Sequence, residues 1–146
     1  MCASMPILLA EDNPDHAELT KKALQRANLA NEIHHVKDGE EALQFLYHEG
    51  RYFGRTNGVK PALIILDLKM PKVDGLGVLR RIKADPELRT IPTVMLTTIE
   101  EKEEMAEAYK LGANSYVTKP VQFSEFVEKV RLVGLYWLLT NEQPKD

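Results

Sequence analysis

The chain has 146 residues, of which 44% are hydrophobic, and this length and composition predict one compact domain. Nineteen lysines and arginines against 22 aspartates and glutamates give a formal net charge of −3, which excludes a general attraction to nucleic acid or to an anionic membrane. The one cysteine, Cys2, cannot form an internal disulfide, no apolar run approaches the roughly 20 residues of a membrane span, and no signal-peptide pattern is present. We therefore expect a soluble protein of the reducing cytoplasm.

Short apolar runs alternate with helical patterns along the chain. The expected strands cover residues 6–10, 31–36, 62–66, 92–97 and 114–118. The expected helices cover residues 14–30, 38–50, 75–88 and 100–112, with a fifth beginning near 121. Asp38 is the predicted N-cap of the second helix, and Gly50 and Gly112 are predicted helix stops. The segment 51–61 combines glycine, asparagine and proline, which indicates a loop.

The apolar strands are continuous rather than alternating, and such strands are buried on both faces of a sheet. Alternation of these strands with helices favours a parallel sheet that is covered by helices on both sides. The sequence therefore predicts a doubly wound α/β domain, in which functional groups gather beyond the carboxyl ends of the strands.

Polar side chains stand at four of these predicted strand ends. Glu11 and Asp12 follow the first strand, Asp67 the third, Thr97 the fourth and Lys119 the fifth. Three neighbouring carboxylates repel one another unless a divalent cation lies among them, and Mg²⁺ accepts carboxylates together with water and phosphate oxygens. We predict a Mg²⁺ site formed by the acids, with Asp67 as a nucleophile that forms an aspartyl phosphate and Lys119 and Thr97 as partners of the phosphoryl oxygens.

Each of these residues also has a simpler structural interpretation. Glu11 and Asp12 would both suit the N-terminus of the first helix as capping acids. Thr98 could replace Thr97 as the functional hydroxyl, because both are ordinary strand formers. These alternatives stay open at the level of residue types, although the gathering of all the groups at one edge favours the chemical interpretation.

The whole pattern resembles the receiver domain of two-component response regulators over about residues 6 to 133. The motifs that carry the resemblance are Glu11-Asp12, Asp67, Asp74-Gly75, Thr97, Tyr116 and Lys119-Pro120. The resemblance implies a flavodoxin-like (CheY-like) five-stranded parallel sheet in the order 2-1-3-4-5. It further implies that Asp67 accepts the phosphoryl group and binds Mg²⁺ together with Glu11, Asp12 and the backbone carbonyl of Lys69. Thr97 would be the switch hydroxyl, Tyr116 the switch aromatic residue and Lys119 the cation that pairs with the phosphate. The peptide bond before Pro120 would be cis.

Four longer segments resemble the single-domain regulators that serve bacterial phytochrome histidine kinases. They are the loop and strand at 48–68, the segments 84–98 and 111–121, and the tail at 134–139. This resemblance implies one receiver domain over 1–146 that is not an enzyme. Its expected partner is a sensor histidine kinase, specifically a bacteriophytochrome, and its expected output is through protein contacts alone.

The last helix changes character after Arg131. Residues 121–131 are amphipathic, whereas 132–146 begin with a run of aliphatic and aromatic residues that leaves no polar face. An apolar surface of this kind usually marks an interface. We expect a homodimer held by the fifth helix and this C-terminal extension; the alternative is a tail that folds back over its own domain.

Two other functions remain to be weighed against a signalling switch. An aspartyl phosphatase of the haloacid dehalogenase type would need a second aspartate two residues after the nucleophile, but Lys69 occupies that position. A phosphorylation-independent interaction module would keep the fold without needing the acids.

Overall fold

The computed structural model describes residues 6–26, 32–52, 60–98 and 101–119, together with 124, 125 and 128. The strands are β1 (Ile7–Ala10), β2 (Ile33–Val36), β3 (Leu63–Asp67), β4 (Thr93–Thr98) and β5 (Ser115–Lys119). The helices are α1 (Pro14–Arg26), α2 (Gly39–Tyr47), α3 (Gly75–Ala84) and α4 (Lys102–Leu111), with a 3₁₀ turn, η2, at Gly50–Tyr52.

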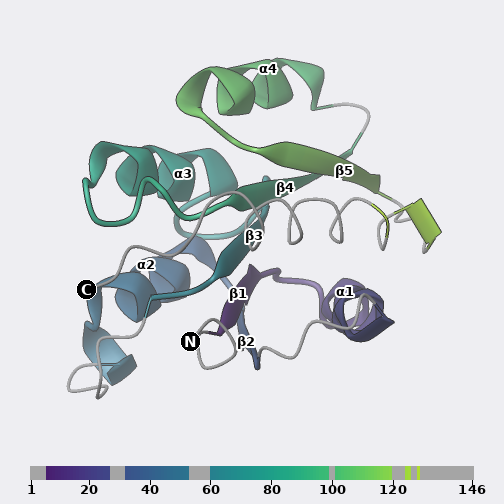
Figure 1. Cartoon of the computed structure of the whole chain (residues 1–146), viewed down its shortest axis with the longest axis horizontal. Coiled ribbons are helices and arrows are strands. Elements are labelled where there is room, and N and C mark those ends of the chain that lie inside the picture. The colour runs from purple at the N-terminus through teal and green to yellow at the C-terminus, as the bar shows by residue number, and fades with distance from the viewer. Residues whose placement is uncertain are drawn as a thin grey trace.

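The five strands form one parallel sheet in the order β2-β1-β3-β4-β5, so that β2 and β5 lie at its two edges (Figure 1). This confirms the predicted fold and strand order. In the register of the sheet, Ala10 is opposite Leu66, and Asp67 is opposite Leu96. The carboxyl ends of β1, β3 and β4 therefore meet at one edge of the sheet.

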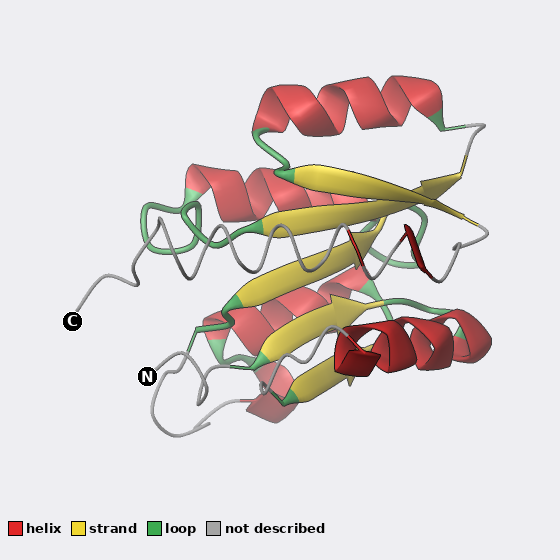
Figure 2. Ribbon diagram, turned by 45° about the vertical axis from the view of Figure 1, so that its right-hand side comes forward, coloured by secondary structure: helices red, strands yellow, loops and turns green. Residues whose placement is uncertain are grey.

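Helices cover both faces of the sheet (Figure 2). Along β1, Leu8 and Ala10 point into a core shared with α2 and α3, whereas Ile7 and Leu9 point into a second core shared with α1. The same alternation occurs along β3, and every residue of both strands is buried. Burial on both faces explains why these strands consist almost entirely of aliphatic residues.

Helix α2 begins as predicted but ends earlier. The Asp38 carboxylate accepts a hydrogen bond from the Glu41 amide at 2.7 Å, which confirms the N-cap. The helix ends at Tyr47 because His48, as its C-cap, already adopts the left-handed conformation with φ of 57°. Gly50 has a positive φ as well, but it lies beyond this cap. Gly50 begins η2, whose last two residues fall in the segment predicted as loop, and this turn packs Tyr52 edge-on against Phe45, with ring centroids 5.2 Å apart.

The ends of α3 and α4 follow their sequence signals to different degrees. Helix α3 stops at Ala84, four residues before the predicted end, and Asp85 is extended with ψ of 119°. The following Pro86 disfavours a helical conformation at Asp85, which explains the early end. Helix α4 ends as predicted, because Gly112 takes a left-handed φ of 109° and its amide donates to two carbonyls of the last turn.

The predicted fifth helix lies mostly outside the described part of the chain. Residues 124, 125 and 128 are helical. The homodimer prediction for 132–146 and the cis bond before Pro120 concern residues that the structure does not describe. Among the described helices, none combines the length and the apolar character that a membrane span requires.

Candidate functional site

Three carboxylates meet at the carboxyl edge of the sheet. Glu11 and Asp12 come directly after β1, and Asp67 ends the neighbouring strand β3. One oxygen from each lies within 4.8 Å of the others. Glu11 is fully buried and Asp67 is 5% exposed, while Asp12 is exposed. The structure thus brings together the three acids that the sequence predicts as a cluster.

This cluster fits a hard divalent cation. Two of the carboxylates are buried, and buried carboxylates near each other are costly without a compensating positive charge. All the donor atoms are oxygens, which suits Mg²⁺ and similar ions, and the exposed position of Asp12 leaves room for water ligands on one side.

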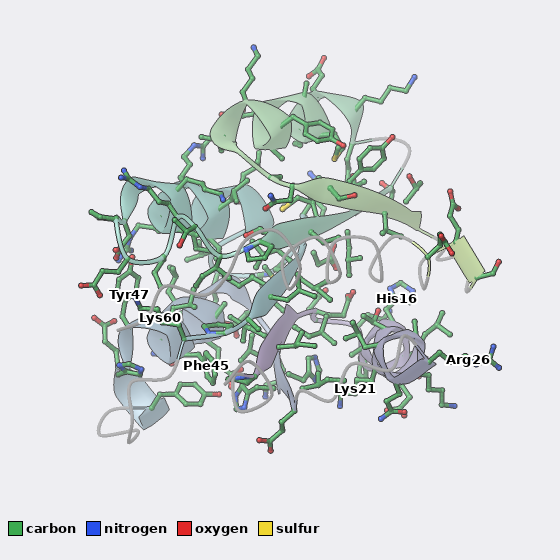
Figure 3. All side chains as sticks on the ribbon, viewed as in Figure 1. His16, Lys21, Arg26, Phe45, Tyr47 and Lys60 are labelled. Atoms are coloured by element: carbon green, nitrogen blue, oxygen red, sulfur yellow. The ribbon has the colours of Figure 1, made fainter. Side chains whose placement is uncertain are left out.

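Glu11 is held in place by its own loop and by α1. Its Oε2 atom accepts a hydrogen bond from the Asn13 amide at 3.2 Å and lies 3.9 Å from Nδ1 of His16, which is on α1 and is labelled in Figure 3. The Nε2 atom of His35, on β2, lies 2.8 Å from the backbone carbonyl oxygen of Glu11. These contacts hold a buried carboxylate at the edge of the sheet, which is a different task from capping α1. Asn13 performs that task, because its side chain accepts from the amides of Asp15 and His16.

The loop after Asp67 is packed tightly against the start of α3. A Cβ atom on Gly75 would lie 2.4 Å from the Asp67 carbonyl oxygen and 2.8 Å from the Leu68 Cα. The Gly75 amide donates to the Leu68 carbonyl at 2.9 Å, and Asp74 caps the helix through the Gly77 amide at 2.9 Å. The Asp74-Gly75 pair therefore fixes the backbone that carries Asp67.

The backbone and the side chain of Lys69 have different surroundings. Its amide lies 3.4 Å from the Asp67 Oδ1 atom, so the main chain of Lys69 borders the acidic cluster. Its ammonium group instead reaches Glu104 on α4, also at 3.4 Å, in an exposed ion pair. The role of the Lys69 carbonyl as a metal ligand stays a prediction.

Thr97 is the buried member of the threonine pair that ends β4. It is 2% exposed, and its hydroxyl lies 2.9 Å from a carboxylate oxygen of Glu101, whereas Thr98 is partly exposed. Because Asp67 is opposite Leu96, Thr97 stands one position beyond Asp67 on the adjacent strand. Burial and register favour Thr97 over Thr98 as the hydroxyl of the site.

Tyr116 lies on β5 beside α4. Its ring packs edge-on against Tyr109, with centroids 5.7 Å apart and an interplanar angle of 89°. Burial, and after it the neighbouring Tyr116, raise the pKa of the Tyr109 phenol above its ordinary value. Thr97 and Tyr116 line the same groove, which is completed by Thr98, Lys102, Met105, Ala106, Tyr109 and Thr118.

Lys119 is the last residue of β5 and is paired with Thr98 in the sheet. Its backbone therefore reaches the same edge as Asp67 and Thr97. The Lys119 side chain is outside the described part of the structure, so its pairing with a phosphoryl group stays a prediction.

Glu101 is a site residue that the sequence did not reveal. It is 6% exposed, and one carboxylate oxygen accepts from both the Thr97 hydroxyl and the Thr98 amide. The sequence shows a run of acids before and within the predicted helix, and a capping-box spacing from a threonine fits both Glu100 and Glu101, so it does not single out Glu101.

Comparisons with known proteins agree with this geometry. The family model described as response regulator receiver domain matches residues 7–131. A curated relative described as probable methanogenesis regulatory protein FilR2, from Methanothrix harundinacea (strain 6Ac), is 41% identical over 94% of this chain and 86% of its own length. Response regulator Rcp1 from Synechocystis sp. (strain ATCC 27184 / PCC 6803 / Kazusa) is 36% identical over 94% of this chain and 92% of its own length.

Two solved structures show the same fold. Bacteriophytochrome response regulator RtBRR superposes with a TM-score of 0.82 at 46% identity, covering 97% of this chain and 84% of its own. The Mn²⁺-bound form of Rcp1 superposes with a TM-score of 0.78 at 35% identity, covering 97% and 99% of the two chains. The resemblances inferred from the motifs, both to receiver domains and to the regulators of bacterial phytochromes, are confirmed. The chain is a member of the response regulator receiver domain family.

Proposed function

We propose that this protein is a two-component response regulator that accepts a phosphoryl group on Asp67 from a sensor histidine kinase. The observation that carries the proposal is the cluster of Glu11, Asp12 and Asp67, with Thr97 one position beyond on the adjacent strand. A carboxylate oxygen of Asp67 attacks the phosphorus of a kinase phosphohistidine. The new P–O bond forms as the P–N bond breaks, and the electron pair returns to the imidazole, which takes up a proton from solvent.

Glu11, Asp12, Asp67 and the Lys69 carbonyl would hold Mg²⁺ at this edge. A bound divalent cation supplies positive charge that offsets the repulsion between the acids and the incoming phosphoryl oxygens. The Mn²⁺-bound structure of Rcp1, a relative, supports a divalent metal in this family.

A partner would recognise the phosphorylated state through a change at the surface of β4, β5 and α4. The Thr97 hydroxyl and the Lys119 ammonium are the groups proposed to turn toward the phosphoryl oxygens. Tyr116 shares a groove with Thr97, so movement of the threonine changes the packing available to the Tyr116 ring. A local change in charge thereby alters a surface that a partner can bind.

Neither alternative function has an observation in its favour. A haloacid dehalogenase-type phosphatase lacks its second aspartate, and the Lys69 side chain at that position is directed to Glu104. A phosphorylation-independent module would not require two buried carboxylates beside a third.

The similarity to RtBRR favours a bacteriophytochrome as the kinase, because RtBRR is named as a bacteriophytochrome response regulator.

A panel of purified histidine kinases with radiolabelled phosphohistidine, phytochromes among them, tests the proposal. We expect rapid transfer from a phytochrome kinase to the wild-type chain and none to Asp67→Asn. Asp74→Asn, which keeps an oxygen for the α3 cap, is the matched control and should accept phosphate normally. Equal transfer to wild type and Asp67→Asn would contradict the assignment.

The C-terminal extension is proposed as the dimerisation element. Its apolar run includes Tyr136 and Trp137, residue types that are common interface anchors. Burying each large side chain contributes about 1.5–3 kcal/mol, so a few from each chain offset the cost of association. Light scattering should give a dimer for the whole chain at micromolar concentration and a monomer for a chain truncated after Val133. A dimer that survives the truncation would assign the contact elsewhere.

A further inference from the structure

The Glu101 carboxylate is buried between the end of β4 and the beginning of α4. It is 6% exposed, and its Oε1 atom accepts from the Thr97 hydroxyl at 2.9 Å and from the Thr98 amide at 2.8 Å. A buried carboxylate is costly unless it is hydrogen-bonded, and these two donors offset that cost. The main chain of Glu101 also begins the helix, because its carbonyl accepts from the Met105 amide at 2.9 Å.

The Thr97 hydroxyl has one proton and therefore one strong hydrogen bond to donate. Two acceptors are within reach: the Glu101 carboxylate at 2.9 Å and the Thr98 carbonyl at 3.2 Å. The carboxylate is nearer and charged, and bonds to charged acceptors are the stronger ones. In the described state the hydroxyl is thus engaged by Glu101.

We infer that Glu101 is a positioning residue that competes with the phosphoryl group for the Thr97 hydroxyl. The inference rests on the proposed function, in which Asp67 carries the phosphoryl group and Thr97 turns toward it. A hydroxyl that donates to a phosphoryl oxygen cannot also donate to Glu101. The switch to the phosphorylated state therefore breaks one of the two hydrogen bonds to this buried carboxylate.

The lost bond couples the site to α4. After the switch, the Glu101 carboxylate keeps only the Thr98 amide as a partner among the contacts described here. A buried carboxylate with fewer donors is less stable where it is, and Glu101 is part of the backbone that begins α4. Phosphorylation thus destabilises the position of Glu101 at the beginning of α4, a helix that lines the groove containing Tyr116.

Removing the Glu101 carboxylate, which competes for the Thr97 hydroxyl, should favour the conformation of the phosphorylated state. In Glu101→Ala, the Thr97 hydroxyl keeps the Thr98 carbonyl as a weaker acceptor. In Glu101→Gln, the shape and an acceptor oxygen remain but the charge is lost, so its effect should be intermediate. Glu103→Ala is the matched control, because it removes an equal charge from an exposed position of the same helix.

The affinity for beryllofluoride, a stable phosphoryl mimic, tests the inference when measured by titration calorimetry with saturating Mg²⁺. Glu101→Ala should bind it about tenfold more tightly than wild type and Glu101→Gln about two- to fivefold more tightly. Glu103→Ala should match wild type. In a Thr97→Ala background, adding Glu101→Ala should change nothing, since the competition requires the hydroxyl.

The remaining outcomes show whether the inference about Glu101 or the proposed function is wrong. Unchanged affinity in both Glu101 variants would overturn the inference. An equal gain in the Thr97→Ala background would also overturn it, because simple charge repulsion would then explain the gain. Absence of beryllofluoride binding in wild type, or equal binding by Asp67→Asn, would instead overturn the proposed function on which the inference rests. Thermal melts of the isosteric Glu101→Gln variant separate these results from misfolding.

Discussion

Replacing Glu11 with glutamine should weaken Mg²⁺ binding by at least about tenfold and, without metal, should raise the melting temperature. The two effects have opposite signs for one reason. Glu11, Asp12 and Asp67 lie within 4.8 Å of one another, so a cation among them is attracted by all three charges. Without a cation the same charges repel, and the fully buried Glu11 carries the largest share of the desolvation cost.

Titration calorimetry measures the affinity, and thermal unfolding in EDTA measures the stability. Glutamine keeps a side-chain oxygen for the Asn13 amide, so the loop after β1 retains its hydrogen bond. Glu18→Gln, on an exposed position of α1, is the control and should change neither quantity. Unchanged Mg²⁺ affinity in Glu11→Gln would remove Glu11 from the proposed ligand set.

Replacing Gly75 with alanine should destabilise the protein by about 1–3 kcal/mol and reduce phosphorylation of Asp67. The new Cβ would lie 2.4 Å from the Asp67 carbonyl oxygen and 2.8 Å from the Leu68 Cα. Both neighbours are backbone atoms, so the strand end or the start of α3 must move. A movement of the strand end shifts the acceptor carboxylate relative to Glu11 and Asp12.

Gly77→Ala is the matched control for this prediction. Its Cβ would meet the tip of the Val73 side chain at 2.8 Å and the Asp74 carboxylate at 3.4 Å. The Val73 methyl group must shift, which costs less than moving backbone, and the preference of a helix for alanine over glycine, about 1 kcal/mol, offsets part of this cost. Denaturant unfolding should therefore show a larger loss for Gly75→Ala than for Gly77→Ala. Equal stability of the two variants would contradict the role given to Gly75.

The sheet and the acidic cluster could be predicted because their physical constraints are visible in the sequence. A strand buried on both faces has little choice but aliphatic residues, and β1 and β3 show this directly. Hydrophobic burial does not explain the acids that follow such strands. Their proximity then follows from parallel strand ends that meet at one edge.

The parts that could not be predicted depend on contacts between segments. Gly112 revealed the end of α4, but the C-cap of α2 is His48, a residue type with no strong signal for the left-handed conformation. The end of α3 was predicted too late, although Pro86 could have indicated it. Glu101 is buried against Thr97 whereas Glu103 is exposed, and no local pattern records this difference.

The most direct test of the central claim is to locate the phosphoryl group. The purified chain is treated with a small phosphodonor and Mg²⁺, reduced with borohydride to trap the acyl phosphate, and mapped by peptide mass spectrometry. We expect a single modification at Asp67 that disappears when EDTA replaces Mg²⁺ and in Asp67→Asn. A modification at another carboxylate, or one that forms equally well in EDTA, would contradict the account.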